Sequence, residues 1–453
     1  MSPFYKQYLL SSVQLTIPEM REIQLEDGKW LYVGEDLKVR SDEGRYTLGL
    51  AFSGTDIQEN GTTLRELSWH WTGKWLLFDD NELITDACGL MAAFYHENEK
   101  GWYVSSSLAV MQSVLKLERI GKINKTRLTW AIIPDTIVEG VKKLLPTQKI
   151  RFNGEKLEIL FDNWIKDYRA LSLDEKCDKV INSLTHAISN IAAEQKPIYL
   201  TLTGGKDCRV VFGCALKAGV PFHCFTFAHD HIQRNDKIVP KRIAKQYGVP
   251  YEFIKGQSFS QEKYNDYCEF VAYNSLGADA EFYAKNVFEA LPKGAFMLKG
   301  GMFEAAQTYG RSLMENSLEG LKLGFEKYYG AYLQDANTKK AWETYYNWVE
   351  ENPIPWLDIR DRLYLEQRCS AWVAALEQSL DITGVNSIQV VNSAEMLSAL
   401  LSATEEERQN LQFAYNLLRL CDSKLLEFPI NKKYPIDKFW IIVNGVKRRL
   451  FRK

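Results

Sequence analysis

Residues 198–254 alternate short apolar strands with helices, and this order restricts the fold more than any other feature of the chain. Strands are expected at 198–200, 223–227 and 251–254, with one helix beginning near residue 209 and another at 237–247. Strands that alternate with helices form a parallel sheet with right-handed crossovers. We therefore predict a parallel α/β sheet in this part of the chain.

The first 165 residues have a different pattern. Short strand-like runs such as KWLYVG, RYTLGLAF, LSWHWTGKWLLFDD and GWYVSS indicate an antiparallel sheet or sandwich, with one helix at 108–117. A longer helix should begin at residue 174 and end before Lys196-Pro197, and the chain from about residue 261 onward is expected to be mostly helical. We predict two domains, 1–165 and 166–453, in an α/β plus α+β fold.

The composition restricts the partners. Among 453 residues, 56 are Lys or Arg and 58 are Asp or Glu, so there is no net field to attract nucleic acid. No apolar run is long enough for a transmembrane segment, and the first residues do not form a signal-peptide pattern. The eight cysteines include no CxxC pair, which favours reduced thiols and a cytoplasmic location. The oligomeric state is left open, with a homodimer among the options.

A glycine turn follows the strand at 198–200, where the sequence reads LTLTGGKDCR. A strand, a glycine turn and a helix can hold a phosphate, because backbone N–H groups and the positive end of the helix converge on the anion. Neither GxxxxGK[ST] nor GxGxxG is present, and a Gly-Gly pair by itself is often only a turn. Asp207 strengthens the phosphate interpretation, because a carboxylate beside a polyphosphate implies a bridging Mg²⁺.

The same stretch resembles the SGGxDS pyrophosphate loop of the ATP pyrophosphatases, and especially their asparagine-synthetase-like members. The resemblance implies that this loop binds ATP through residues Thr203, Gly204, Gly205, Lys206, Asp207, Cys208 and Arg209. In that family a substrate carboxylate attacks the α-phosphorus while the loop holds the pyrophosphate. Thr203 and Cys208 depart from the two serines of the motif. Thr203 keeps the hydroxyl, whereas Cys208 should contact phosphate weakly or not at all.

Further motifs extend the resemblance along the chain. Asp236 lies where the family has an aspartate before a helix, and the string around Asp86 resembles the end of the family's first domain. Gly300-Gly301-Met302-Phe303-Glu304 is similar to a second glycine-rich acidic motif, which implies a nucleotide contact at Gly301 and a metal ligand at Glu304. Taken alone, Glu304 would be better explained as a solvated loop acid, and the site interpretation depends on the other motifs.

The segment KLLEFPINKK resembles the region where the family places a lysine that neutralises the phosphates in the transition state. Lys432 and Lys433 are both candidates, and a solvated surface pair is the alternative. Tyr364, Glu366 and Glu377 lie where β-lactam-forming relatives have a Tyr/Glu pair that deprotonates the amine. We retain Tyr364 and Glu377 as catalytic candidates, although helical spacing also explains all three by packing and solvation.

The first domain resembles a class II glutamine amidotransferase of the Ntn type that lacks its nucleophile. That nucleophile is a cysteine at the mature amino terminus, whereas the present chain reads Met1-Ser2-Pro3 and its first cysteine is Cys88. We therefore expect no glutaminase activity and an amine carried by a substrate. The pair His229 and His231 could bind a metal, but without a third ligand a polar loop explains it better.

The predicted function is an ATP- and Mg²⁺-dependent ligase. It would adenylate the carboxylate of a small molecule, glycan or peptide, release pyrophosphate and join the acyl group to an amine. One alternative is a tRNA-modifying enzyme of the same fold. The balanced charge and the lack of a basic stripe for binding RNA disfavour it. Another is an inactive scaffold that binds nucleotide.

Overall fold

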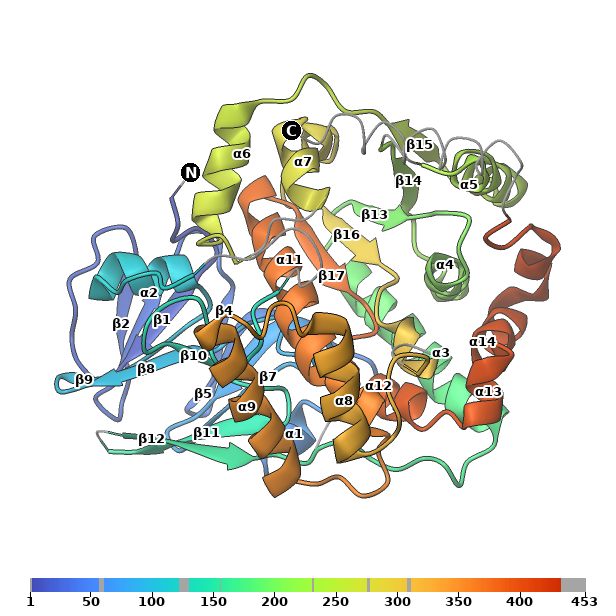
Figure 1. Cartoon of the computed structure of the whole chain (residues 1–453). Coiled ribbons are helices and arrows are strands. Elements are labelled where there is room, and N and C mark those ends of the chain that lie inside the picture. Colours follow the sequence, from blue (N-terminus) through green and yellow to red (C-terminus); the bar gives the residue numbers. More distant parts are fainter. Residues whose placement is uncertain are drawn as a thin grey trace, which may run out of the picture.

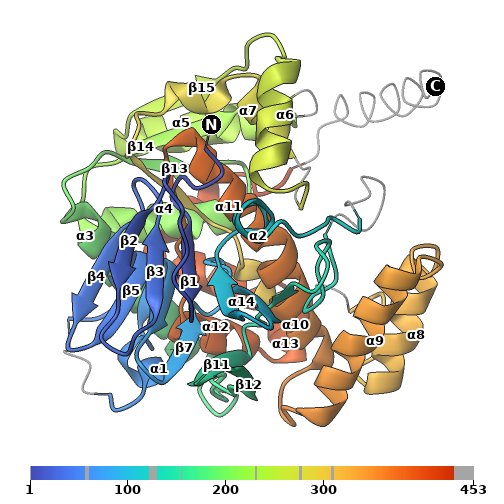
Figure 2. The same cartoon turned by 90° about the vertical axis from the view of Figure 1, so that its left-hand side faces the viewer.

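The computed structural model describes residues 2–56, 61–121, 130–154, 156–229, 232–274, 278–307 and 311–432. Two antiparallel sheets lie on one side of the molecule, and a parallel sheet flanked by helices lies on the other (Figures 1 and 2). The expected mixture of antiparallel sheets, a parallel sheet and helices is confirmed. Of the described helices, none is long and apolar enough to cross a membrane.

The antiparallel sheets each contain six strands and share an apolar core. The first has the order β10-β8-β9-β1-β3-β2, with strands Lys142–Lys143, Phe94–Asn98, Gly101–Ser105, Tyr8–Ser11, Trp30–Val33 and Arg21–Gln24. The second has the order β12-β11-β7-β6-β5-β4, with strands Lys156–Phe161, Gln148–Asn153, Glu82–Thr85, Trp71–Phe78, Arg45–Ser53 and Val39–Asp42. Inward side chains such as Leu10, Leu31, Leu76 and Trp102 fill the space between the sheets. All four predicted strand runs are therefore confirmed; the Ntn-type assignment stays a prediction.

The parallel sheet has the order β15-β14-β13-β16-β17, and every neighbouring pair is parallel. Its strands are Tyr251–Ile254, His223–Phe227, Ile198–Thr201, Phe296–Lys299 and Asn386–Gln389. From β13 the chain builds outward to β15 and then returns to place β16 on the other side of β13. In open α/β sheets, ligands bind beyond the carboxyl ends of the strands at such a switch in strand order.

Helices cover both faces of this sheet. On one face pack α3 (Leu173–Ala192), α4 (Asp207–Ala218) and α5 (Arg234–Tyr247), and on the other α7 (Ala278–Ala284) and a short 3₁₀ turn, Val287–Ala290. The start of α3 is fixed by a capping box, in which Ser172 and Glu175 satisfy each other's backbone N–H groups. Together with α2 (Leu108–Leu115), the helices expected before residue 250 are confirmed within a few residues.

The prediction of a mostly helical chain after residue 261 missed β16 and β17. Both strands have only four residues, FMLK and NSIQ, and are almost wholly buried. Short apolar runs do not distinguish a buried strand from a helix segment by periodicity. The remaining described elements after residue 261 are indeed helical: α6 (Gln261–Phe270), α8 (Leu318–Tyr329), α9 (Ala336–Glu351), α10 (Ile359–Leu363), a π-helical stretch (Tyr364–Val373), α11 (Ala374–Ser379), α12 (Ala394–Leu401), α13 (Glu405–Gln409), α14 (Gln412–Asp422) and 3₁₀ turns Phe303–Ala306, Leu380–Thr383 and Ser423–Glu427. A short helix in the antiparallel part, α1 (Leu64–Leu67), was not predicted.

Buried polar contacts join the antiparallel sheets to the parallel-sheet part. The Asp86 carboxylate is fully buried and accepts the backbone N–H groups of Trp75, Cys88, Leu90 and Met91 at 2.8–3.2 Å. It also accepts the side-chain amide of Asn392, which follows β17, at 2.7 Å. The two parts thus share satisfied polar groups in their interface, and the boundary at residue 165 stays a prediction.

Candidate nucleotide site at the switch in strand order

The glycine loop, residues 202–206, joins β13 to α4 at the carboxyl edge of the parallel sheet. A Cβ atom on Gly204 would lie 1.8 Å from the Asn235 side-chain nitrogen, so a larger residue there would displace that amide. Its N–H donates to Asp236 Oδ1 at 2.6 Å, and its carbonyl accepts from Asn235 Nδ2 at 3.2 Å. Asp236, expected among the nucleotide-binding residues, therefore holds the loop in place from the first turn of α5.

Cys208, which was expected to contact phosphate weakly or not at all, bonds within the glycine loop itself. Its thiol lies inside the loop, accepting the N–H of Thr203 at 3.2 Å and lying 3.3 Å from the Thr203 hydroxyl. The same hydroxyl accepts the N–H of Gly205 at 3.2 Å. Burial raises the pKa of Cys208, so this residue remains a neutral thiol. Cys208 and Thr203 therefore tie the turn together from within.

The amino end of α4 lies next to this turn. Its N-cap residue is Lys206, whose side chain makes no capping bond to the first N–H groups of the helix. Such N–H groups, together with the helix dipole, favour an anion. The Lys206 ammonium donates to Gln307 Oε1 at 3.0 Å and lies 3.5 Å from Asp207 Oδ1.

The two predicted metal ligands act on each other. Asp207 begins α4, while Glu304 is exposed on the 3₁₀ turn that follows β16. Burial is the main cause that raises the pKa of Asp207; Lys206 counteracts it, and the negative charge of Glu304 adds to it. A cation between the carboxylates would relieve this repulsion. Among the described residues no group of three or more His, Cys, Asp or Glu side chains could hold a metal, so a Mg²⁺ here would take its other ligands from phosphate and water.

The second glycine motif packs against the first. A Cβ atom on Gly300 would lie 3.0 Å from the backbone of Asp207, and one on Gly301 would lie 2.3 Å from Gln389 Oε1. The Gly301 N–H already donates to that Gln389 oxygen at 3.0 Å. The described contacts of Gly301 thus position β16 against β17, and its predicted nucleotide contact stays a prediction.

Arg209 has a role that the sequence did not indicate. Its guanidinium is buried and donates to four backbone carbonyls, those of Gly204 at 2.9 Å, Leu425 at 3.1 Å, Phe428 at 2.9 Å and Pro429 at 2.6 Å. These bonds fasten residues 425–429 to the glycine loop. With every described bond directed to backbone, Arg209 is a positioning residue for both segments.

Lys432 is brought close to the loop by its neighbour. The N–H of Asn431 donates to the Gly204 carbonyl at 3.0 Å, and Asn431 adopts a left-handed backbone with φ of 47°. Lys432 follows directly and is exposed. The other candidate, Lys433, lies outside the described residues, as does His231 of the predicted histidine pair.

The predicted Tyr/Glu candidates have separate surroundings. Glu377 is buried; it accepts Lys299 Nζ at 3.0 Å, Ser387 Oγ at 2.7 Å and Gln389 Nε2 at 2.7 Å. Despite its burial, these donors lower the pKa of Glu377, which makes it a poor general base. The buried Tyr364 has its pKa raised by burial, Cys369 and Glu304. Their joint role in deprotonating an amine stays a prediction.

Glu366 belongs to a different buried hydrogen-bond network from Glu377. It is buried, accepts the Tyr345 hydroxyl at 2.9 Å and pairs with Arg362 at 3.1 Å. It also accepts a hydrogen bond from Thr147 of the antiparallel part. The packing explanation therefore suits Glu366 best.

Several residues of the site escaped sequence reasoning. The side-chain amides of Asn235, Gln307 and Gln389 bond to the two glycine motifs, Gln307 through both Lys206 and Asp207, and the backbone N–H of Asn431 bonds to Gly204. Amide side chains have no spacing rule that would reveal such contacts. Only Asn235 could have been suspected from the sequence, because it is next to the predicted site residue Asp236.

Comparison with known proteins gives limited information. No family model matches the chain, and no curated protein matches it. Among solved structures, the glutamine-dependent NAD⁺ synthetase of Acinetobacter baumannii, in complex with ADP, is similar with a TM-score of 0.22 and 14% identity, over 42% of this chain and 38% of the other. The NMN synthetase of Francisella tularensis has a TM-score of 0.22 and 12% identity, over 44% of this chain and 94% of the other. The chain thus spans well under half of the first protein, and likenesses this weak carry no argument about function.

Proposed function

We propose that the chain is an ATP- and Mg²⁺-dependent ligase that adenylates a carboxylate, releases pyrophosphate and transfers the acyl group to an amine. One observation carries the proposal. The glycine loop and the amino end of α4 lie at the switch in strand order, beside the interacting carboxylates of Asp207 and Glu304. An anion-attracting helix end next to a place for a divalent cation suits a metal–polyphosphate group.

The residues would divide the work as follows. The N–H groups of α4 and the ammonium of Lys206 would attract the pyrophosphate part of ATP. Asp207 and Glu304 would hold Mg²⁺, which neutralises phosphate charge when bound. Adenylation by in-line displacement needs positioning and charge neutralisation more than covalent catalysis, so these groups would suffice for the first half-reaction.

A lysine from the 425–433 segment would complete the charge balance. Lys432 follows Asn431, whose N–H is bonded to Gly204, and the segment is fastened by Arg209. A compact ammonium can follow phosphate oxygens as their charge redistributes. Lys433 is proposed for the same role on the sequence resemblance alone.

For the antiparallel part we propose a degenerate class II amidotransferase-like domain without glutaminase activity. Ser2 is exposed, and its hydroxyl accepts the N–H of Phe4 at 3.2 Å, well before β1 begins at Tyr8. An exposed serine hydroxyl with no described base is a weak nucleophile. The amine would accordingly arrive on a substrate, and the carboxylate would belong to a small molecule, a glycan or a peptide.

A second candidate is a nucleotide-binding scaffold without catalysis. Three backbone N–H groups of the glycine motifs, at Gly204, Gly205 and Gly301, donate to protein oxygens. Contacts of this kind would weaken phosphate binding unless the loops rearrange. The described residues offer no observation that favours the tRNA-modifying alternative.

Exchange of labelled pyrophosphate into ATP distinguishes these functions. The protein would be incubated with ATP, Mg²⁺, labelled pyrophosphate and pools of small-molecule, glycan and peptide carboxylates. We expect exchange that depends on one class of acid and disappears in Asp207→Asn, while Asp178→Asn, an exposed aspartate on α3, behaves as wild type. Nucleotide binding without exchange for any acid would favour the scaffold.

A further inference from the structure

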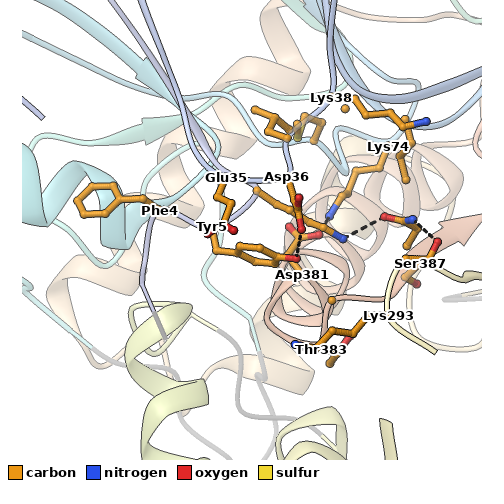
Figure 3. Close-up of a pocket in the computed structure, with 18 of the residues that line it drawn as sticks. Phe4, Tyr5, Glu35, Asp36, Lys38, Lys74, Lys293, Asp381, Thr383 and Ser387 are labelled. Atoms are coloured by element: carbon orange, nitrogen blue, oxygen red, sulfur yellow. Dashed lines mark hydrogen bonds and ion pairs between the residues drawn. The ribbon is translucent and has the colours of Figure 1, made fainter. Parts of the chain in front are cut away.

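A cavity of about 930 Å³ lies between the antiparallel sheets and the amino edge of the parallel sheet (Figure 3). It is lined from the antiparallel part by Ser2, residues 4–6, residues 35–38 and Lys74, among others, and from the other part by Lys196, Lys293, Asp381, Thr383, Gly384, Asn386 and Ser387. Its volume is in the range of small-molecule pockets, roughly 300–1,000 Å³. Because it meets the amino ends of β16 and β17, it is at the opposite edge of the sheet from the glycine loop.

One ion pair in the cavity wall is already satisfied. The buried Lys74 ammonium donates to Asp381 Oδ1 at 2.5 Å and to the carbonyl of Glu377 at 3.3 Å. The other Asp381 oxygen accepts from Gln7 Nε2 at 3.1 Å. Figure 3 shows Lys74 and Asp381 among the lining side chains, with Lys293 and Thr383 below Asp381 in this view. This pair contributes no net charge.

Lys6 is a second cation in the cavity wall; it forms no described ion pair, and its ammonium lies 5.7 Å from the centre of the Tyr5 ring. Its backbone is left-handed with φ of 56°, an uncommon conformation for a residue other than glycine, and its N–H donates to the Glu35 carbonyl at 2.8 Å. The Lys6 ammonium donates to Asn386 Oδ1 at 3.0 Å and to the Val385 carbonyl at 3.3 Å. Both acceptors are neutral, and an ammonium has a third N–H.

The lowered pKa of Lys6 is consistent with a site that lacks negative charge close to its ammonium. Burial lowers the pKa of Lys6 to about 8. Among the charged groups that face it, Asp381 and Asp36 raise this pKa, while Lys74 and Lys196 lower it. A bound anion would favour the protonated amine and so bind best where Lys6 is charged.

The rim of the cavity is exposed and of mixed charge. Lys196 and Lys293 face it from one part, and Glu19, Glu35 and Asp36 from the other, where Tyr5 donates to Asp36 at 2.7 Å. Exposed charges are screened and contribute little individually. The half-buried Lys6 therefore decides which sign of ligand the cavity favours.

We propose that this cavity binds a small anion, a carboxylate or a phosphate, whose oxygen accepts the remaining N–H of Lys6. The rim lysines Lys196 and Lys293 add attraction at the entrance. Because the walls come from both parts of the chain, the anion bridges them. The site is independent of the proposed ATP site.

Calorimetric titration of the full chain with succinate and, separately, with inorganic phosphate tests the proposal. We expect one anion to bind at pH 7 and Lys6→Met to weaken that binding about 10- to 100-fold, the range for one charge-assisted hydrogen bond. Lys322→Ala, which removes an exposed lysine on α8, should leave binding unchanged. Binding of succinate alone identifies a carboxylate site, and binding of phosphate alone a phosphate site.

The pH dependence of the wild-type chain gives a second readout that needs no variant. Binding requires the charged amine, so affinity should fall as pH rises through about 8, where the free Lys6 loses its proton. Absence of binding by both anions, affinity that is flat from pH 7 to 9, or equal affinity in Lys6→Met and the wild type would each overturn the proposal.

Discussion

Replacement of Arg209 by Met should destabilise the protein and release the segment that precedes Lys432. Met keeps much of the apolar stem, but the carbonyls of Leu425, Phe428 and Pro429 lose their described guanidinium donors, whereas the Gly204 carbonyl keeps Asn235 and Asn431. At about 1 kcal/mol for each of these three carbonyls, the free energy of unfolding should fall by about 3 kcal/mol. The free energy of unfolding of Arg209→Lys should lie between those of the wild type and Arg209→Met, because a lysine has three donors but no planar guanidinium.

Urea denaturation and hydrogen exchange would measure the two effects. The matched control is Arg419→Met on α14, because Arg419 is half-exposed and pairs with the exposed Asp174, so its loss should change stability by less than about 0.5 kcal/mol. In Arg209→Met the amide of Asn431, bonded to Gly204 in the wild type, should exchange faster. A stability loss below about 1 kcal/mol together with unchanged exchange at Asn431 would refute the positioning role.

Three other predictions concern activity. Asp207→Ala should abolish pyrophosphate exchange while circular dichroism and unfolding stay near wild type, because a metal ligand is lost from a loop edge and not from the core; exchange that survives would exclude Asp207 as a metal ligand. The chain should release no glutamate from glutamine, and a free amine should support product formation at least as well, as amino-acid analysis of reaction mixtures would show; glutamate release coupled to ATP use would contradict this. Either Lys432→Ala or Lys433→Ala should lower kcat of the first half-reaction by roughly 10²-fold with little change in KM for ATP, as expected for a contact made mainly in the transition state; near-normal kcat in both would shift the assignment to Lys206 or Lys299.

Local patterns predicted the elements that depend on local chemistry. The helix that the sequence places at residue 174 begins one residue earlier, after the Ser172 capping box, and the strand before Gly204 adjoins the turn into α4. Propensity and capping act over a few residues, so the sequence was sufficient. The parallel pairing of β13, β14 and β15 followed from the alternation of strands with helices.

The parts that could not be predicted depend on distant residues. Arg209 bonds to carbonyls more than 200 positions away, and Gln389 reaches Gly301 from another strand. β17 is paired with β16 although 86 residues separate them, and its NSIQ sequence has few of the β-branched or aromatic residues that mark a strand. Such contacts arise from tertiary packing, for which one sequence holds no periodic signal.

The buried carboxylate of Asp86 also bears on how this chain could be cut or recombined. Its four amide donors belong to the antiparallel part, but its fifth comes from Asn392, and the nearby Lys74 depends in the same way on Asp381. A fragment that stops near residue 165 would lose the Asn392 donor of Asp86 and the Asp381 partner of Lys74, and it would expose to water the apolar side chains that pack against the other part. The two parts should therefore melt in one calorimetric transition, and an exchanged amino-terminal half would need matching changes at positions 381 and 392 to fold.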